Sequence, residues 1–206
     1  MKLTVVLPGL VAVLFVTGCT TVPPKDYTEF RKHQPKSILV LPPLNNTTEL
    51  LAGYSVYTAT SVPISELGYY VFPVVIVDQF LKENGLPTPS EMHQVPLAKL
   101  REVFGADAVL YITVERYGSK YQLFASNTVV TASARLVDTG SGVCIWESRV
   151  DFVQGGRSGL LEAVLDQVIN KLLDQAHEAA QRASGLLFNQ PNQGLLKGRR
   201  HPEFGK

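Results

Sequence analysis

Apolar residues recur at helical spacing near the end of the chain and predict a long amphipathic helix. Asp, Gln, Asn and Lys side chains stand between them, so one face of the helix is apolar and the other polar. Ser158 is suited to cap the start of this helix, and Gly185 is suited to end it. We expect the apolar face to pack on a sheet, and its members are Leu160, Leu161, Val164, Leu165, Val168, Ile169, Leu172, Leu173 and Ala176.

Alternating apolar and polar residues upstream of this helix predict a three-stranded antiparallel meander. The predicted strands are separated by a tight turn at Gly118-Ser119 and by a hairpin loop over 138–142. One side of each strand is apolar and the other is wetter, as in antiparallel sheets with one covered face. The three strands cover residues 107–117, 121–138 and 143–152.

The first half of the chain alternates apolar runs with helical patterns. A continuous apolar run over 37–41 predicts a buried strand, which Pro42-Pro43 ends because proline has no N–H to donate. A second short strand is expected over 69–73. Helical patterns, each followed by a glycine, cover 52–67, 74–84 and 96–104. This order predicts an α/β fold with a mixed sheet, parallel in its early part and antiparallel in the meander, with packed helices that include the long C-terminal one.

The first nineteen residues have the layout of a bacterial secretion signal that ends in a lipidation site. Lys2 precedes an apolar run over 3–16, and Thr17-Gly18 then leads to Cys19. This resembles a lipobox, in which the Cys19 thiol receives fatty acyl chains such as palmitate and becomes the new amino terminus. The apolar run is shorter than the roughly 20 residues of a membrane-spanning helix, so we expect a lipid anchor instead. Thr20 follows Cys19 in place of aspartate, which by resemblance to enteric lipoproteins favours the outer membrane.

These signals divide the chain into four parts. A signal peptide covers residues 1–18, and the polar, proline-bearing stretch 19–36 predicts a lipidated tether. Residues 37–188 are expected to form a single α/β domain, which is long enough for a full hydrophobic core. Residues 189–206 contain a short run of basic residues and predict a flexible basic tail.

Composition and charge narrow the functional classes. Hydrophobic residues make up 45% of the chain, which excludes wholesale disorder. The formal net charge of +1 argues against a nucleic-acid partner, because such domains carry clustered Lys and Arg. Lipidation of Cys19 leaves Cys144 without a disulfide partner, since the chain has two cysteines. Cys144 alternates with Trp146 on the predicted inner strand face, so we expect its thiol to be buried.

The sequence contains no recognisable catalytic constellation. Its four histidines are scattered, and none has a second ligand at the spacing of a zinc site. The stretch Gly155–Gly159 lacks the lysine of a phosphate loop; a flexible turn explains it, and anion binding remains the alternative. A glycosidase would need a pair of catalytic carboxylates. Solvated positions on the predicted strands are enough to explain the candidates, which are Glu115, Asp138, Glu147 and Asp151. We therefore expect a protein without enzymatic activity, catalytic residues, metal or cofactor.

Three segments carry a family resemblance: Gly68–Val74, Gly105–Tyr111 and Ala134–Asp138. They resemble a bacterial outer-membrane lipoprotein family that includes a neisserial surface-antigen candidate. The likeness covers most of the chain and implies an α/β sandwich at the outer membrane, with no established activity. More distantly, Ser37–Thr47 is similar to the opening strand of the curli-secretion lipoprotein, the amino-terminal domain of the Tol-system propeller protein and the lipoprotein activators of penicillin-binding proteins. Arg135 in a predicted strand departs from a lipid-facing pattern, so we expect no pore from this chain alone.

Together these observations predict a lipid-anchored, non-enzymatic binding or assembly module of the outer membrane that faces the periplasm. Its expected partners are outer-membrane lipid, through acylated Cys19, and envelope or secretion proteins; self-association into a homo-oligomer is also open. Tyr54 and Tyr57 are candidates for a partner surface because aromatic residues are enriched at interfaces, although core packing is the competing role for each. The alternatives are a regulator of a peptidoglycan synthase and, less favoured, a cell-wall hydrolase.

Overall fold

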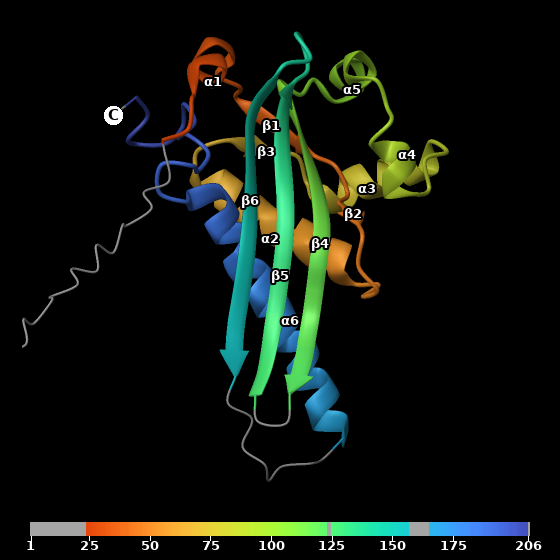
Figure 1. The fold of residues 1–206 in the computed structure, drawn as a ribbon. Coiled ribbons are helices and arrows are strands. Elements are labelled where there is room, and N and C mark those ends of the chain that lie inside the picture. The colour runs from red at the N-terminus through yellow and green to blue at the C-terminus, as the bar shows by residue number, and fades with distance from the viewer. Residues whose placement is uncertain (1–23, 123–124, 157–164, 206) are drawn as a thin grey trace, which may run out of the picture.

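The computed structural model describes residues 24–122, 125–156 and 165–205 (Figure 1). Its sheet has the strand order β3-β1-β4-β5-β6, with β2 paired to β4. β1 runs parallel to β3 and β4, whereas β4, β5 and β6 are antiparallel, so the predicted mixed α/β fold is confirmed. The elements in chain order are α1 (Thr28–His33), β1 (Ser37–Val40), β2 (Leu44–Asn45), α2 (Ala52–Glu66), β3 (Tyr70–Val71), α3 (Val74–Glu83), α4 (Pro89–Met92), α5 (Leu97–Phe104), β4 (Ala108–Gln122), β5 (Ala125–Asp138), β6 (Cys144–Gly156) and α6 (Leu165–Asn189).

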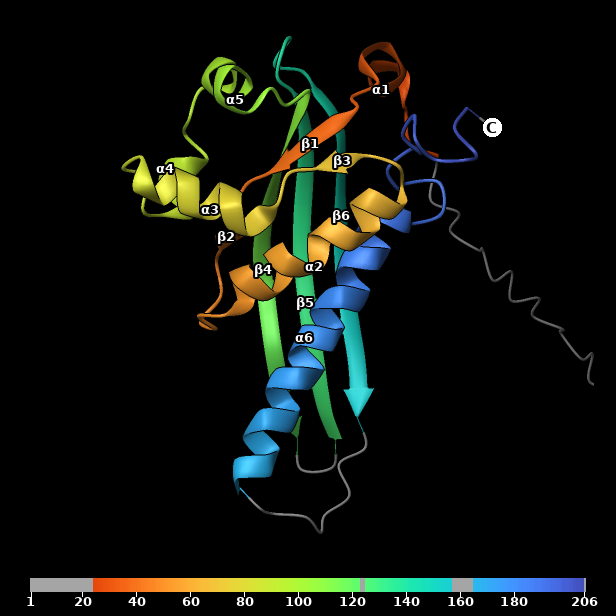
Figure 2. The same ribbon diagram turned by 180° about the vertical axis from the view of Figure 1, so that it is seen from behind.

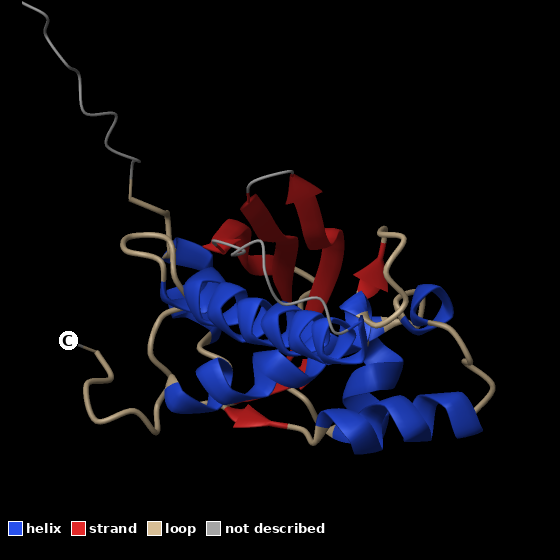
Figure 3. Cartoon of the chain, turned by 90° about the horizontal axis from the view of Figure 1, so that it is seen from below, coloured by secondary structure: helices blue, strands red, loops and turns tan. Residues whose placement is uncertain are grey.

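Helices cover both faces of the sheet, but not to the same extent. α2 and α6 cross one face along the meander (Figure 2), and Figure 3 shows this helical layer against the strands from below. α3, α4 and α5 pack on the other side of β1 and the start of β4, where Leu39, Leu41 and Val109 meet Leu100. Because β1 is buried on both faces, its sequence is continuously apolar and does not alternate.

Three predicted helices end where the sequence indicates. α2, α3 and α5 are each followed within two residues by a glycine with positive φ, a conformation that costs other residues about 1 kcal/mol or more. These residues are Gly68 (φ 88°), Gly85 (φ 83°) and Gly105 (φ 69°).

The meander is longer than the sequence predicts. The expected turn at Gly118-Ser119 is wrong, because β4 continues to Gln122 and Gly118 pairs with Val129 inside the ladder. Gly118 adopts φ 117°, so a residue that looks like a turn signal is accommodated within a strand. β6 likewise continues beyond Phe152 to Gly156.

A β-bulge changes the orientation of Cys144. The register pairs Leu136 with Trp146 and Val137 with Cys144, which leaves Ile145 as the extra residue. Ile145 and Trp146 are therefore both buried, while Cys144 is exposed. The predicted burial of this thiol is wrong because a one-residue shift moves a side chain to the opposite face.

The C-terminal helix is confirmed over α6, whereas residues 158–164 of the predicted pattern, with the proposed cap Ser158, lie outside the described residues. Gly185 does not end the helix as predicted. It lies inside α6, and its carbonyl accepts a hydrogen bond from Asn189 Nδ2 at 2.9 Å. The buried face of the helix over its described side chains comprises Ala176, Ala179, Ala180, Ala183, Ser184, Leu187 and Phe188.

The segments on either side of the predicted domain pack onto it. Lys25 N–H donates to the carbonyl of Asn192 at 3.0 Å, and Trp146 Nε1 donates to the carbonyl of Gln193 at 3.1 Å. Phe30 and Leu195 are buried in the core. The structure thus corrects two boundaries: residues 24–36 belong to the fold and not to the tether, and residues 190–201 pack on the domain and are not a flexible tail. In the described ranges, no helix combines the length and apolar composition needed to cross a bilayer.

Candidate functional site

The structure separates the two tyrosines that the sequence offers as a partner surface. Tyr57 is 2% exposed, and its hydroxyl lies 3.1 Å from the carbonyl of Val40 and 2.9 Å from that of Val74. Burial raises the pKa of this phenol, so it remains a neutral donor. Tyr57 is therefore a core residue, and its assignment to a partner surface is corrected.

Tyr54 keeps the exposure that a partner surface requires. It is 48% exposed on the first turn of α2, and its hydroxyl accepts a hydrogen bond from Lys82 Nζ at 2.8 Å. Lys82 also pairs with Asp78 at 2.7 Å, which raises the pKa of its ammonium group. This contact connects the start of α2 with the end of α3. Cys19, the predicted lipidation site, lies outside the described residues.

Four aromatic rings form a continuous row across β3, α5 and α3, which we call the aromatic edge: Tyr70, Phe72, Phe104 and Phe80. Successive ring centroids lie 5.0, 6.2 and 5.3 Å apart, each pair in an edge-to-face arrangement. Tyr70 and Phe80 at the two ends are exposed. β3 is itself the outermost strand of the sheet on this side.

Exposed apolar side chains concentrate around this row. Val75 is 67% exposed and Ile76 is 60% exposed on α3, immediately after Phe72 and Pro73. The guanidinium of Arg200 lies 5.9 Å from the ring centroid of Tyr70, which places a cation at the margin. A sequence signal existed, because the run from Val74 to Val77 is too apolar for a helix with one buried face. Exposed apolar side chains gathered in this way make the aromatic edge a candidate interaction site.

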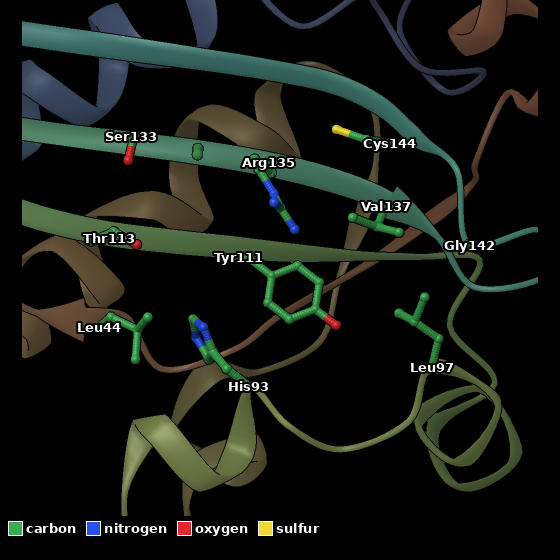
Figure 4. Close-up of a pocket in the computed structure, with 11 residues that line it drawn as sticks. Leu44, His93, Leu97, Tyr111, Thr113, Ser133, Arg135, Val137, Gly142 and Cys144 are labelled. Atoms are coloured by element: carbon green, nitrogen blue, oxygen red, sulfur yellow. The ribbon is translucent and has the colours of Figure 1, made fainter.

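A cavity of about 540 Å³ opens on the other face of the meander, between β4, β5 and the segment from α4 to α5 (Figure 4). Leu44, Leu97 and Val137 supply its apolar walls, and Cys144 lies at its edge. Its polar lining residues are His93, Tyr111, Thr113, Ser133 and Arg135. This cavity was not predictable from the sequence, because its residues come from five separate elements and the loops between them.

His93 is fixed in this cavity as a neutral side chain. Its Nε2 lies 2.9 Å from the carbonyl of Pro42, an oxygen that only accepts, so Nε2 carries the hydrogen. Its ring meets that of Tyr111 edge-to-face at 5.2 Å. Burial lowers the pKa of His93, and the nearby Arg135 lowers it further, although the bond to Pro42 opposes this shift. Burial also raises the pKa of Tyr111, so among the described residues that line the cavity only Arg135 carries a charge.

Two of the strand carboxylates, Asp151 and Glu115, lie in ion pairs beyond this cavity. Asp151 accepts from Thr131 Oγ1 at 2.9 Å, from Arg116 at 2.8 Å and from Arg149 at 3.3 Å. These hydrogen bonds lower the pKa of Asp151, and the bond from Thr131 has the largest effect. Glu115 pairs with Arg149 on the same face. The lowered pKa of Asp151 does not fit the protonated acid that glycoside hydrolysis requires.

The described residues give no support for an anion-binding turn at Gly155–Gly159 or for a metal site. Gly155 and Gly156 pair with Asn127 and Ser126 at the end of β6, and the rest of the proposed anion-binding turn lies outside the described residues. Among the residues that the structure describes, no cluster of His, Cys, Asp or Glu is suited to hold a metal ion.

Comparison with known proteins identifies the family. A family model described as "Putative lipoprotein GNA1162-like" matches residues 25–200. The chain belongs to this family. A relative from Neisseria meningitidis serogroup B, described as "Putative lipoprotein NMB1124/NMB1162", is 42% identical over 205 residues and covers 95% of both chains. The expected resemblance to a lipoprotein family with a neisserial member is confirmed.

One solved structure agrees with this assignment. The crystal structure of lipoprotein GNA1162 from Neisseria meningitidis is similar with a TM-score of 0.57 and 41% identity, over 68% of this chain and 99% of that one. A PelC dodecamer from Paraburkholderia phytofirmans matches with a TM-score of 0.49 and 16% identity, over 81% of this chain and 91% of that one. This second likeness says nothing about assembly of the GNA1162-like protein.

Proposed function

We propose that this GNA1162-like protein is a lipid-anchored, non-enzymatic binding module at the periplasmic side of the outer membrane. In this proposal the acylated Cys19 holds the domain in place, and the aromatic edge docks an envelope or secretion protein. The observation that supports it best is the row of four aromatic rings beside exposed Val75 and Ile76.

The composition of the aromatic edge favours a protein partner. Tyr and Phe are enriched in the centres of protein interfaces, where they bury a large area with little loss of side-chain entropy. Arg200 lies at one margin of this row, close to Tyr70. We therefore expect the partner to present apolar side chains flanked by acidic ones.

The absence of enzymatic activity is part of the same proposal. The strand carboxylates Glu115 and Asp151 are engaged by arginines, and His93 donates to a backbone carbonyl. Regulation of a peptidoglycan synthase is a special case of partner docking, because the synthase would then be the captured protein. Stimulation of that purified synthase by the full chain would identify this case.

The docking proposal predicts position-specific crosslinks in intact cells. A photo-crosslinking amino acid at Val75 or Ile76 should capture an envelope protein, whereas the same amino acid at the exposed position Arg182 on α6 should not. Cys19→Ala should release the protein from the outer membrane, as measured by membrane fractionation, and should abolish the Val75 crosslink.

Two results would contradict the proposal. Equal capture at Val75 and Arg182 would show that the aromatic edge is not a docking surface. Retention of Cys19→Ala in the outer membrane would show that Cys19 is not the anchor.

A further inference from the structure

We propose that the cavity lined by His93, Tyr111 and Arg135, on the face of the meander opposite α2 and α6, is a binding site. Its ligand would be an organic carboxylate with an adjacent apolar group, such as the C-terminal residue of a peptide. The site is separate from the aromatic edge and does not depend on the docking function proposed above.

Arg135 is the first reason for this assignment. The other two arginines on this face of the meander, Arg116 and Arg149, are paired with carboxylates, but Arg135 forms no ion pair with any residue the structure describes. Glu147 lies opposite Arg135 in the β5–β6 register without pairing to it, and no Asp or Glu is among the described residues that line the cavity. A guanidinium without a partner matches the planar, two-oxygen geometry of a carboxylate.

The second reason is a set of hydroxyl groups beside this guanidinium. Tyr111 lies opposite Arg135 across β4 and β5, and Thr113 lies opposite Ser133 one pleat further along. Residues two apart on a strand share a face, so all four side chains meet at the same wall of the cavity. None of their side chains hydrogen-bonds another residue in the described part of the chain. Figure 4 shows Arg135 extending toward Tyr111, whose ring faces His93.

The third reason is the volume of the cavity together with its apolar wall, which favour a carboxylate that also carries an apolar group. A volume of about 540 Å³ exceeds what a small inorganic anion fills and lies in the range of sites for larger organic ligands. Leu44, Leu97 and Val137 form an apolar wall facing the polar one. A ligand with a carboxylate at one end and an apolar side chain at the other satisfies both walls.

N-acetylleucine is a suitable probe, and its binding to the full mature chain in detergent micelles is measured by NMR chemical-shift titration. For a ligand of this size we expect a Kd of about 1 to 10 mM. N-acetylleucinamide, acetate and inorganic phosphate should each bind at least about tenfold more weakly, because each lacks either the charge or the apolar group. The affected amides should include those of Tyr111, Ser133 and Arg135.

Arg135→Gln should weaken N-acetylleucine binding at least about tenfold, as expected for loss of a charge-assisted hydrogen bond. Arg116→Gln is the matched control, because it removes an arginine from the same sheet face outside the cavity. Ser133→Ala should produce a smaller loss, and an unchanged thermal midpoint in each variant shows that the fold is retained. Unchanged affinity in Arg135→Gln, equal binding of the amide, the acetate or the phosphate, or no binding of N-acetylleucine would overturn the proposal.

Discussion

The two neighbouring tyrosines of α2 show that residue type alone does not identify an interface. Tyr54 and Tyr57 stand three positions apart, yet one is exposed and the other is buried with its hydroxyl between two carbonyls. Only the packing of α2 against β1 and α3 distinguishes them. Tyr57 thereby joins the end of β1 to the start of α3, beside the aromatic edge.

Tyr57→Phe should lower the free energy of unfolding by about 1 to 2 kcal/mol, because the carbonyls of Val40 and Val74 lose a buried donor. Tyr54→Phe is the control and should change stability by less than about 0.5 kcal/mol, since its bond to Lys82 is exposed. Urea denaturation measures both values. Equal effects of the two substitutions would contradict the role assigned to the Tyr57 hydroxyl.

His93 should make the stability of the protein depend on pH. Its pKa is lowered in the fold, mainly by burial, so at acid pH the unfolded chain takes up a proton that the native state does not. Its contribution is therefore fully present above the unfolded pKa of about 6.5 and is lost as the pH falls from there toward the folded pKa.

His93→Gln retains a donor for the Pro42 carbonyl and removes this titration. Between pH 7 and pH 5.5, the wild type should lose up to about 1 kcal/mol more stability than this variant. Thermal unfolding at the two pH values measures the difference. Parallel pH profiles for the two proteins would show that His93 is not the titrating group.

At the scale of elements, the sequence predicts those features that depend on neighbouring residues alone, such as helix ends and strand alternation. Gly68, Gly85 and Gly105 follow helices because their backbone conformation suits glycine, and strand alternation reveals the meander. The bulge at Ile145 and the interior positions of Gly118 and Gly185 were not predictable, because strand pairing and helix packing override the local preference of a residue.

The packing of residues 190–201 was also hidden in the sequence, because backbone groups make many of its contacts. Gly198 N–H donates to the Leu67 carbonyl at 2.7 Å, and a Cβ on Gly198 would lie 2.8 Å from the carbonyl oxygen of Gly68. Such a contact pattern leaves no apolar periodicity for sequence analysis to detect.

Gly198→Ala should therefore destabilise the protein by about 1 to 3 kcal/mol, because the added methyl group forces the segment away from Gly68. Gly185→Ala is the matched control. An added Cβ meets nothing within 4 Å inside α6, and the change should stabilise the protein by about 0.5 to 1 kcal/mol. Chemical denaturation of both variants is the measurement, and destabilisation by Gly185→Ala or none by Gly198→Ala would contradict the packing described.

At the scale of the whole molecule, the fold places its two candidate surfaces apart. The aromatic edge lies along β3, α5 and α3, while the cavity containing Arg135 opens on the meander. Neither was predictable as a site: the cavity is assembled from elements distant in sequence, and the aromatic edge depends on the packing of α5 against α3 and the residues after β3. The apolar run at Val75 and Ile76 nevertheless carried a signal, since both residues are apolar beyond what one buried helix face needs.

The early start of the fold limits how far the domain reaches from the bilayer. Residues 24–36 pack against the body, so with acyl chains on Cys19, as proposed, only about five peptide steps separate lipid from fold. Fully extended, these span at most about 18 Å. The domain then meets partners within a thin layer above one leaflet, where their effective concentration is high and weak contacts are sufficient. Proximity to the membrane surface thus selects partners before any specific contact forms.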